Sequence, residues 1–372
     1  MLGRFRHVDW VLLLATLPIM GAGLVSMYSF VGVNNYFERQ LLWIPIALMI
    51  SLGLSLFDVR ALRKSNTILA IFLFFTALLL LLFLVGSVFK GAQSWFNLGA
   101  FAVQPADPMK LVLILLLAKY FSRRHVEIAR VKHIFISGFY AFIPCVLVHI
   151  QPDFGSAIIL FAVWLGMTMV SGISKTHFAV VFGAGAIAFV LLWSFVLQPY
   201  QQQRIKTFLH PLTDIRGAGY NAYQSTIAVG SGSVFGKGIG YGTQSRLKFL
   251  PEYQTDFIFA SFAEEWGFVG VALLLLCFGV VIWRILLVAM TGATNFETLY
   301  AMGLAIFLMT QLIIHIGMNI GLLPVTGQTL PFMSYGGSHL VTEFAGLGIL
   351  MGMRRFARVS HPESMKNEFL GI

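Results

Sequence analysis

The sequence predicts an all-α, polytopic membrane protein with about ten transmembrane helices and a large extracytoplasmic loop between helices 7 and 8. Of its 372 residues, 58% are hydrophobic and only 11% are charged, whereas a soluble domain carries about 25% charged residues. The apolar residues also form long uncharged runs, such as Thr67–Val85, and such a run is long enough to cross a bilayer as a helix. The first run lacks a cleavage pattern after a short core, which indicates a retained helix.

The hydropathy pattern places the helices within a single transmembrane domain covering residues 1–372. The fourth span is short and is expected to extend or tilt. The predicted spans are 9–31, 40–57, 66–88, 108–121, 134–150, 154–171, 177–197, 256–283, 298–320 and 338–353.

The distribution of Lys and Arg predicts the orientation. With a cytoplasmic N-terminus, 16 of the 25 cationic residues fall in cytoplasmic segments, and six of the other nine lie in the long loop at about 198–255. Short loops decide orientation, and the short outer segments hold only Arg39, Lys90 and Lys110. We therefore expect both termini in the cytoplasm.

Composition also argues against several classes of function. The net charge of +10 would suggest nucleic-acid binding in a soluble protein, but here the cations lie in short clusters between apolar runs. They are expected to face anionic lipid. The two cysteines, Cys145 and Cys277, lie inside apolar runs and are expected to pack there, and the nine histidines show no metal-ligand spacing.

Two carboxylates lie where the eighth predicted span begins. Pro251 suits the first turn of a helix, so Glu252 and Asp256, four residues apart, are expected on one helical face. A carboxylate beside a basic, glycine-rich loop suits a substrate with a phosphate and a hydroxyl to deprotonate. An ordinary interfacial helix start with solvated charges is the alternative. The cations of the preceding loop are Arg204, Lys206, Arg216, Lys237, Arg246 and Lys248.

Further polar groups lie in or near predicted spans. Lys110 and Asp153 fall at outer helix ends, where an ion pair or a helix cap is the alternative to substrate binding. Lys237 lies in a glycine-rich stretch, Tyr220–Gln244, whose spacing is not a nucleotide-binding fingerprint, and the alternative for its side chain is snorkelling. Glu343 lies inside the last span, where an acid is costly and is a functional candidate. The proline- and glycine-rich segment Gly321–Gly337 is expected to dip into the membrane.

The combination of several motifs resembles the SEDS family of cell-wall polymerases, which includes RodA, FtsW and SpoVE. The resemblance spans nearly the whole chain, and the short cytoplasmic ends favour the RodA type, which serves elongation and cell shape. Its most specific parts are Pro251-Glu252 with Thr255-Asp256-Phe257, Glu264-Glu265-x-Gly267, Gln224-Ser225 with Gly230-Ser231-Gly232, Pro324-Val325-Thr326-Gly327, and Pro331-Phe332-x-Ser334-Tyr335-Gly336-Gly337.

The resemblance implies a peptidoglycan glycosyltransferase that polymerises lipid II, an undecaprenyl-diphosphate-linked substrate. It implies that Asp256 is the essential carboxylate and that a class B penicillin-binding protein, a transpeptidase, is the partner. The residues expected to bind substrate are Glu252, Arg204, Gln224, Ser225, Lys237, Lys110, Asp153 and Ser334.

The mechanism expected is inverting transfer, with Asp256 as the general base for the acceptor hydroxyl. Loop cations or a divalent cation, Mg or Mn, would stabilise the leaving diphosphate, although no protein metal site is identifiable in the sequence. Two alternatives remain open: a lipid II flippase or transporter, and a non-catalytic scaffold for the penicillin-binding protein.

Overall fold

The computed structural model is a bundle of long helices with a small sheet at one end. It describes residues 8–29, 35–57, 62, 65–89, 92–97, 99, 102–123, 131–172, 183, 185, 202, 206–208, 218–247, 249–250 and 252–360. The long helices are α1 (Trp10–Tyr28), α2 (Asn35–Leu56), α3 (Ser65–Val85), α4 (Ala106–Ser122), α5 (Val131–Ile150), α6 (Phe154–Val170), α11 (Ile258–Met290), α12 (Asn295–Asn319) and α13 (Gly337–Ser360).

Nine of the ten predicted spans correspond to these helices. The remaining span, 177–197, falls almost wholly outside the described residues. Among the described helices, six (α1, α2, α3, α5, α11 and α12) are long and apolar enough to cross a membrane, and α6 is a shorter apolar helix. The expected polytopic membrane architecture is therefore confirmed.

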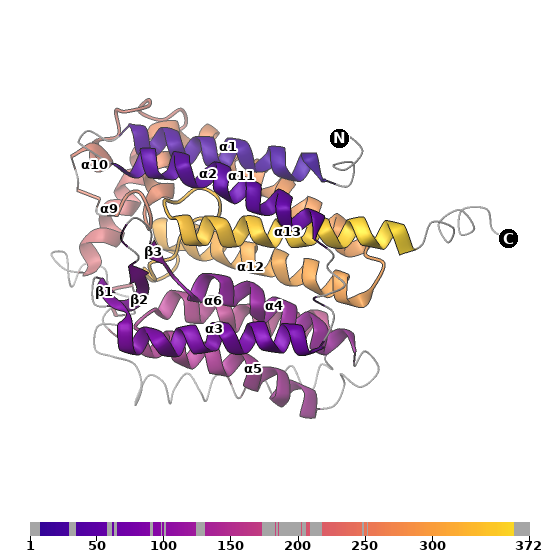
Figure 1. Ribbon diagram of the computed structural model, residues 1–372. Coiled ribbons are helices and arrows are strands. Elements are labelled where there is room, and N and C mark those ends of the chain that lie inside the picture. The colour runs from indigo at the N-terminus through magenta and orange to yellow at the C-terminus, as the bar shows by residue number, and fades with distance from the viewer. Residues whose placement is uncertain are drawn as a thin grey trace.

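The shorter elements gather at one end of the bundle, and the start of α1 and the end of α13 lie at the opposite end (Figure 1). They are α9 (Ala218–Ser231), α10 (Thr243–Arg246) and the strands β1 (Ser87–Phe89), β2 (Ala92–Asn97) and β3 (Ala102–Val103). The strands form an antiparallel sheet in the order β1-β2-β3, with Phe96 opposite Val103.

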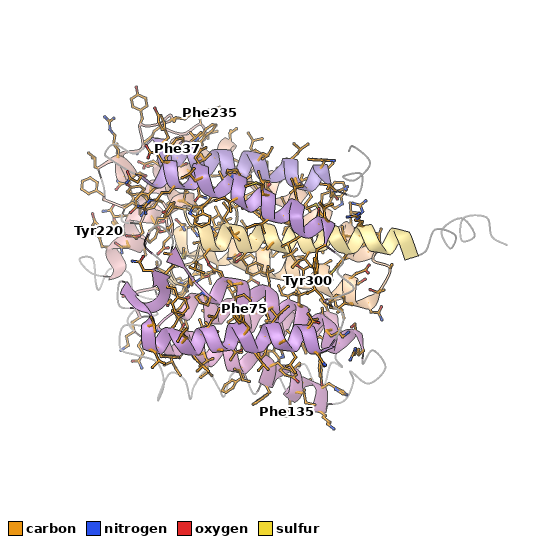
Figure 2. All side chains as sticks on the ribbon, viewed as in Figure 1. Phe37, Phe75, Phe135, Tyr220, Phe235 and Tyr300 are labelled. Carbon is orange, nitrogen blue, oxygen red and sulfur yellow. The ribbon has the colours of Figure 1, made fainter. Side chains whose placement is uncertain are left out.

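Helix α4 lies at the centre of the bundle, against α3, α5, α6, α12 and α13. It is apolar on nearly all sides and nearly all its side chains are buried, as expected of a helix surrounded by others. Large apolar side chains remain exposed on the periphery: Figure 2 shows Phe135 at the edge and Tyr300 within the bundle, and their exposed fractions are 72% and 0%. An apolar periphery of this kind is typical of a protein surrounded by membrane lipid.

The segment between α12 and α13 is non-helical but lies inside the protein, because Leu330, Phe332 and Ser334 are fully or almost fully buried. Met333 lies against α1, where its carbonyl oxygen approaches Gly23. Irregular backbone at membrane depth is tolerated where protein covers it. Protein therefore covers residues 330–334 of this segment, and the dip of Gly321–Gly337 into the membrane stays a prediction.

Candidate active site

Asp256 lies in a tight turn immediately before α11. The amides of Thr255 and Phe257 both donate to the Glu252 carbonyl, at 3.1 and 3.2 Å. Phe257 is the N-cap of α11, so the Asp256 carboxylate lies close to the helix N-terminus, where the helix dipole favours negative charge. The side chain is half-buried.

The expectation that Glu252 and Asp256 share one helical face is wrong. Helix α11 begins only at Ile258, and Glu252 has a φ of 51°, in the left-handed region. The two carboxylates still belong to one turn. Backbone hydrogen bonds to the Glu252 carbonyl, rather than helical spacing, define this turn.

The segment before α13 holds this turn from one side. The Ser334 hydroxyl donates to the Thr255 carbonyl at 2.9 Å and accepts from the Leu330 amide at 2.8 Å. The Tyr335 amide donates to the Gln254 carbonyl at 2.9 Å. Because the Ser334 side chain is fully buried and both of its bonds are internal, it fixes the turn and does not face a substrate.

Gly327 borders the carboxylate itself. Its φ is 73°, a conformation that glycine adopts without strain, and a methyl group added there would lie 3.4 Å from the Asp256 Oδ2. The Pro324–Gly327 motif therefore forms part of the wall beside Asp256.

Helix α9 carries Gln224 and Ser225 next to the same region and packs against α11 and α12. Ser225 is fully buried, and its hydroxyl donates to the Asn319 backbone carbonyl at 2.8 Å. Gln224 is half-buried. The serine thus anchors α9 to the end of α12, while Gln224 keeps an accessible surface.

The glycine-rich loop is bound to α11 rather than shaped around an anion. The amides of Lys237 and Gly238 donate to the carbonyls of Glu264 and Glu265, both at 3.0 Å. Gly267 interrupts the helix with φ 64° and ψ −167°. The backbone of Gly236 packs so closely on it that a methyl group on either glycine would collide with the other segment.

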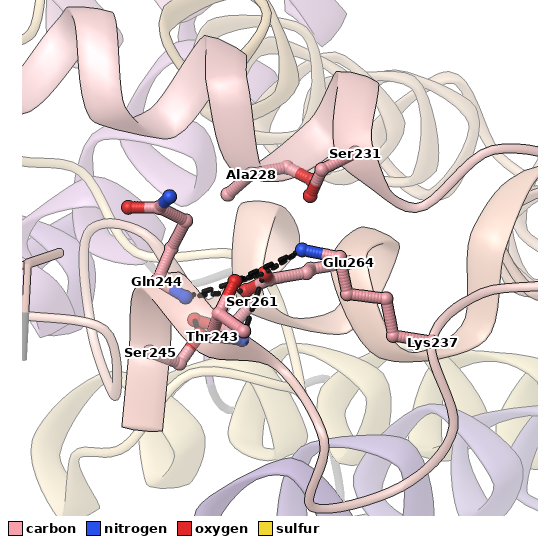
Figure 3. Close-up of polar contacts among 8 residues, drawn as sticks. All are labelled: Ala228, Ser231, Lys237, Thr243, Gln244, Ser245, Ser261 and Glu264. Atoms are coloured by element: carbon pink, nitrogen blue, oxygen red, sulfur yellow. Dashed lines mark hydrogen bonds and ion pairs between the residues drawn. The ribbon is translucent and has the colours of Figure 1, made fainter. Parts of the chain in front are cut away.

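Figure 3 shows the polar contacts that complete this attachment. Lys237 Nζ donates to the Glu264 carboxylate at 2.7 Å, and the Thr243 and Gln244 amides donate to it at 2.9 and 3.2 Å. The Ser245 and Ser261 hydroxyls lie 3.0 Å apart beside them. Lys237 is therefore engaged within the protein, although 30% of its side chain remains exposed.

A second polar cluster surrounds the start of α4. Lys110 Nζ lies 3.0 Å from Asp107 Oδ1, and both side chains are almost completely buried. Gln104 Nε2 donates to Asp153 Oδ2 at 2.6 Å, while the Ser156 amide donates to Asp153 Oδ1 at 3.0 Å. Asp153 is thus the N-cap of α6.

Burial raises the pKa of Asp153 above its usual value, while the Lys110 charge and the hydrogen bonds from Ser156 oppose that rise. Both alternatives weighed for this region therefore occur together: Asp107 and Lys110 form an ion pair, and Asp153 caps a helix.

The predicted site residues fall into three groups. Asp256, Glu252, Ser334 and Ser225 belong to one connected region, with Gln224 on the adjoining helix. Lys237 lies in the loop cluster on α11, and Lys110 and Asp153 lie in the cluster at α4. Arg204 lies outside the described residues, as do Arg216 and Lys248, whereas Arg246 is described and exposed.

Sequence reasoning missed Asn319, whose side-chain amide donates to the Asp256 carbonyl at 3.0 Å. The signal was an asparagine at the end of an apolar span, where an amide needs hydrogen-bond partners. Glu343, a candidate in the last span, is fully buried and accepts from the Phe332 amide at 2.8 Å.

The described part of the chain contains no group of three or more His, Cys, Asp or Glu residues that could hold a metal ion.

The fold and site define a polytopic membrane protein with a fixed carboxylate at one end of its helix bundle. The model of the cell cycle protein family comprising FtsW, RodA and SpoVE matches residues 5–359. The chain belongs to this family.

The sequence aligns with curated relatives over almost their whole length. Stage V sporulation protein E of Bacillus subtilis is 36% identical over 94% of this chain and 98% of its own. The peptidoglycan glycosyltransferase MrdB of Escherichia coli is 36% identical over 93% of both chains. A probable peptidoglycan glycosyltransferase FtsW of Thioalkalivibrio is 34% identical over 97% of this chain and 92% of its own.

Solved structures show the same fold. A chain of a peptidoglycan synthase complex, described for its coordination of polymerization and crosslinking, superposes with a TM-score of 0.80 at 29% identity, covering 94% of this chain and 98% of that one. The rod shape determining protein RodA of Thermus thermophilus superposes with a TM-score of 0.70 at 29% identity, covering 93% and 96%.

Proposed function

We propose that this protein is a peptidoglycan glycosyltransferase that polymerises lipid II, with Asp256 as the general base. The observation that carries the proposal is the fixed turn before α11. The backbone of Gln254, Thr255 and Asp256 is hydrogen-bonded by Tyr335, Ser334 and Asn319, while the Asp256 side chain stays half-buried. A rigid backbone with an accessible carboxylate suits a base that must meet a hydroxyl at one position.

The transfer requires one proton acceptor. The 4-hydroxyl oxygen of the acceptor sugar attacks the anomeric carbon of the donor, and the bond from that carbon to the diphosphate oxygen breaks. The electron pair leaves with the diphosphate, and the hydroxyl proton passes to Asp256. A single carboxylate in this role fits direct inversion, because a covalent sugar intermediate would need a separate nucleophile.

The diphosphate is the part of the substrate that positive charge stabilises. Arg246, at the end of α10, is an exposed cation, whereas Lys237 is engaged with Glu264. We place Glu252, Gln224 and Arg246 as substrate-binding groups around Asp256, and Arg204, outside the described residues, stays a prediction from the sequence. The described residues contain no group of three or more His, Cys, Asp or Glu residues that could hold a metal ion, so a divalent cation, Mg or Mn, would be held mainly by the diphosphate itself.

The relatives support a cellular setting for the proposed activity. One structural neighbour belongs to a complex that couples polymerization and crosslinking, which supports a class B penicillin-binding protein as the partner. Lipid II has its sugars outside the bacterial cytoplasmic membrane, so the proposed orientation puts Asp256 outside and both termini inside. Resemblance to RodA and MrdB supports a role in elongation.

The test is polymerisation of purified lipid II by the purified protein in detergent, with Asp256→Asn compared with wild type. We expect glycan strands from the wild type and at least a 100-fold loss in the variant, with the melting temperature retained. The matched control is Glu38→Gln, which neutralises an exposed carboxylate at the start of α2 and should remain active. Full activity of Asp256→Asn would reject its role as the base. In proteoliposomes, transbilayer movement of lipid II without polymer would favour a flippase.

A further inference from the structure

Asn319 is the last residue of α12 and is completely buried at the joint between the Asp256 turn and α11. We propose that Asn319 is a positioning residue that sets the direction of the Asp256 carboxylate for catalysis. This proposal rests on the function proposed above, in which Asp256 is the base.

The Asn319 side chain uses its full hydrogen-bonding capacity. Its Nδ2 donates to the carbonyls of Asp256 and His315, at 3.0 and 2.8 Å. Its Oδ1 accepts from the Ala260 amide at 3.2 Å. The Ser225 hydroxyl shares its one hydrogen between the Asn319 backbone carbonyl, at 2.8 Å, and this Oδ1, at 3.2 Å. A side-chain amide has two donor hydrogens and one oxygen with two lone pairs, so this environment satisfies every one of them.

The surroundings permit one orientation of the amide. Turning it over would place its NH2 against the Ala260 N–H and its oxygen against two carbonyls. A buried polar group left without its hydrogen bond destabilises the folded state, so the turned orientation is strongly disfavoured. Asn319 is therefore a rigid link and not an adjustable contact.

The link compensates for a missing helix cap. The first amides of a helix have no partner within it, and a side chain at the N-cap usually accepts from the amide of the second or third residue. The N-cap of α11 is Phe257, which cannot accept such a bond. Asn319, from a different helix, accepts the third amide of α11, that of Ala260.

The Asn319 side chain thus forms hydrogen bonds with the backbone on both sides of the joint between the Asp256 turn and α11. Its NH2 holds the carbonyl of Asp256 while its oxygen holds the amide of Ala260. The direction of the Asp256 side chain follows from the backbone angles of this joint. Displacing a catalytic group by about 1 Å can cost roughly 100-fold in rate, so a change at Asn319 should act on the rate of transfer and not on substrate affinity.

The experiment compares Asn319→Leu with Gln311→Leu. Gln311 is a buried amide on the same helix, and it makes no recorded hydrogen bond through its Oε1. Both changes replace a buried amide with an apolar side chain of similar size. Single-turnover rates of lipid II polymerisation are measured for both variants, together with the affinity and stoichiometry of lipid II binding and the pH dependence of the rate.

We expect Asn319→Leu to lower the single-turnover rate by about 10- to 100-fold while lipid II binds with unchanged stoichiometry and an affinity within about threefold. We expect Gln311→Leu to retain its rate. The stoichiometry separates the two roles, since a merely structural loss would reduce the fraction of protein that binds. The acid limb of the pH profile should also move in Asn319→Leu and not in the control.

If Asn319→Leu does not fold, Asn319→Asp is measured in its place. Aspartate keeps the acceptor for Ala260 and Ser225 but loses both donated bonds, so the same loss of rate is expected. A wild-type rate in either folded variant would overturn the proposal. Asp256→Asn is run alongside: if it stays active, the proposed function fails first, whereas an inactive Asp256→Asn beside a fully active Asn319 variant rejects only the role of Asn319.

Discussion

Lys237 Nζ lies 2.7 Å from the fully buried Glu264 carboxylate. This ion pair binds the glycine-rich loop to α11, shortly before Gly267 interrupts that helix. The carboxylate also accepts bonds from the amides of Thr243 and Gln244. Two motifs separated along the chain, Gly230–Gly238 and Glu264–Gly267, are therefore one structural unit. Gly232, Gly236 and Gly267 permit close approach of the two backbones, a role different from that of glycines in a phosphate-binding loop.

The ion pair between Lys237 and Glu264 gives a prediction that separates anchoring from substrate binding. We expect Lys237→Met to lower the melting temperature and to speed protease cleavage within 232–247, with little change in lipid II affinity. A substrate-binding lysine would behave in the opposite way, weakening lipid II binding at an unchanged melting temperature. Thermal unfolding, limited proteolysis and direct lipid II binding on the same preparations decide between them.

Glu264→Gln should be more harmful than Lys237→Met, because the amide presents an NH2 group to several donors. Each buried donor left without an acceptor costs about 1–3 kcal/mol of folding stability. The measurement is the free energy of unfolding in a mild detergent. Equal stability of wild type and Glu264→Gln would contradict the anchoring role of the carboxylate.

The buried ion pair of Asp107 and Lys110 should behave as a unit. Removing one partner leaves an uncompensated buried charge and costs about 3–5 kcal/mol, so Lys110→Met alone is expected to be severely destabilised. The double variant Asp107→Asn with Lys110→Met should recover much of that loss, because neither charge remains. Unfolding of both single variants and of the double variant completes the cycle, and additive losses would show that the pair is not coupled.

Asp153 should make stability depend on pH. Burial raises its pKa in the folded protein, so the folded state holds this proton more tightly than the unfolded state does. Its contribution is fully present below the unfolded pKa of 3.8 and is lost as pH rises through the raised folded pKa, at a slope of at most about 1.4 kcal/mol per pH unit.

Asp153→Asn tests this dependence, because asparagine can keep the cap on the Ser156 amide but does not titrate. We expect its unfolding free energy to fall less than that of the wild type as pH rises from 4 to 7. Parallel curves for the two proteins would show that Asp153 is not the group responsible. Unfolding in detergent over this pH range provides the measurement.

The sequence by itself was sufficient to determine the membrane class, nine helices with ends up to seven residues from those observed, and the motif around Asp256. In lipid, the backbone N–H and C=O groups of a helix must bond within the helix, because there is no water to bond them. Such helices are therefore recognisable in the sequence as long, uncharged apolar runs. Family motifs identified the acid because they are local: Glu252 and Asp256 lie in one short turn whatever its exact geometry.

Only the tertiary structure decided which groups hold that turn and which polar side chains form hydrogen bonds within the protein. Ser334, Ser225 and Lys237 were expected at the substrate, yet their hydrogen bonds are to Thr255, Asn319 and Glu264. Partners of this kind lie from 27 to 94 residues apart, and no local periodicity encodes them. They follow from the need of every buried polar group for a partner once the helices have packed.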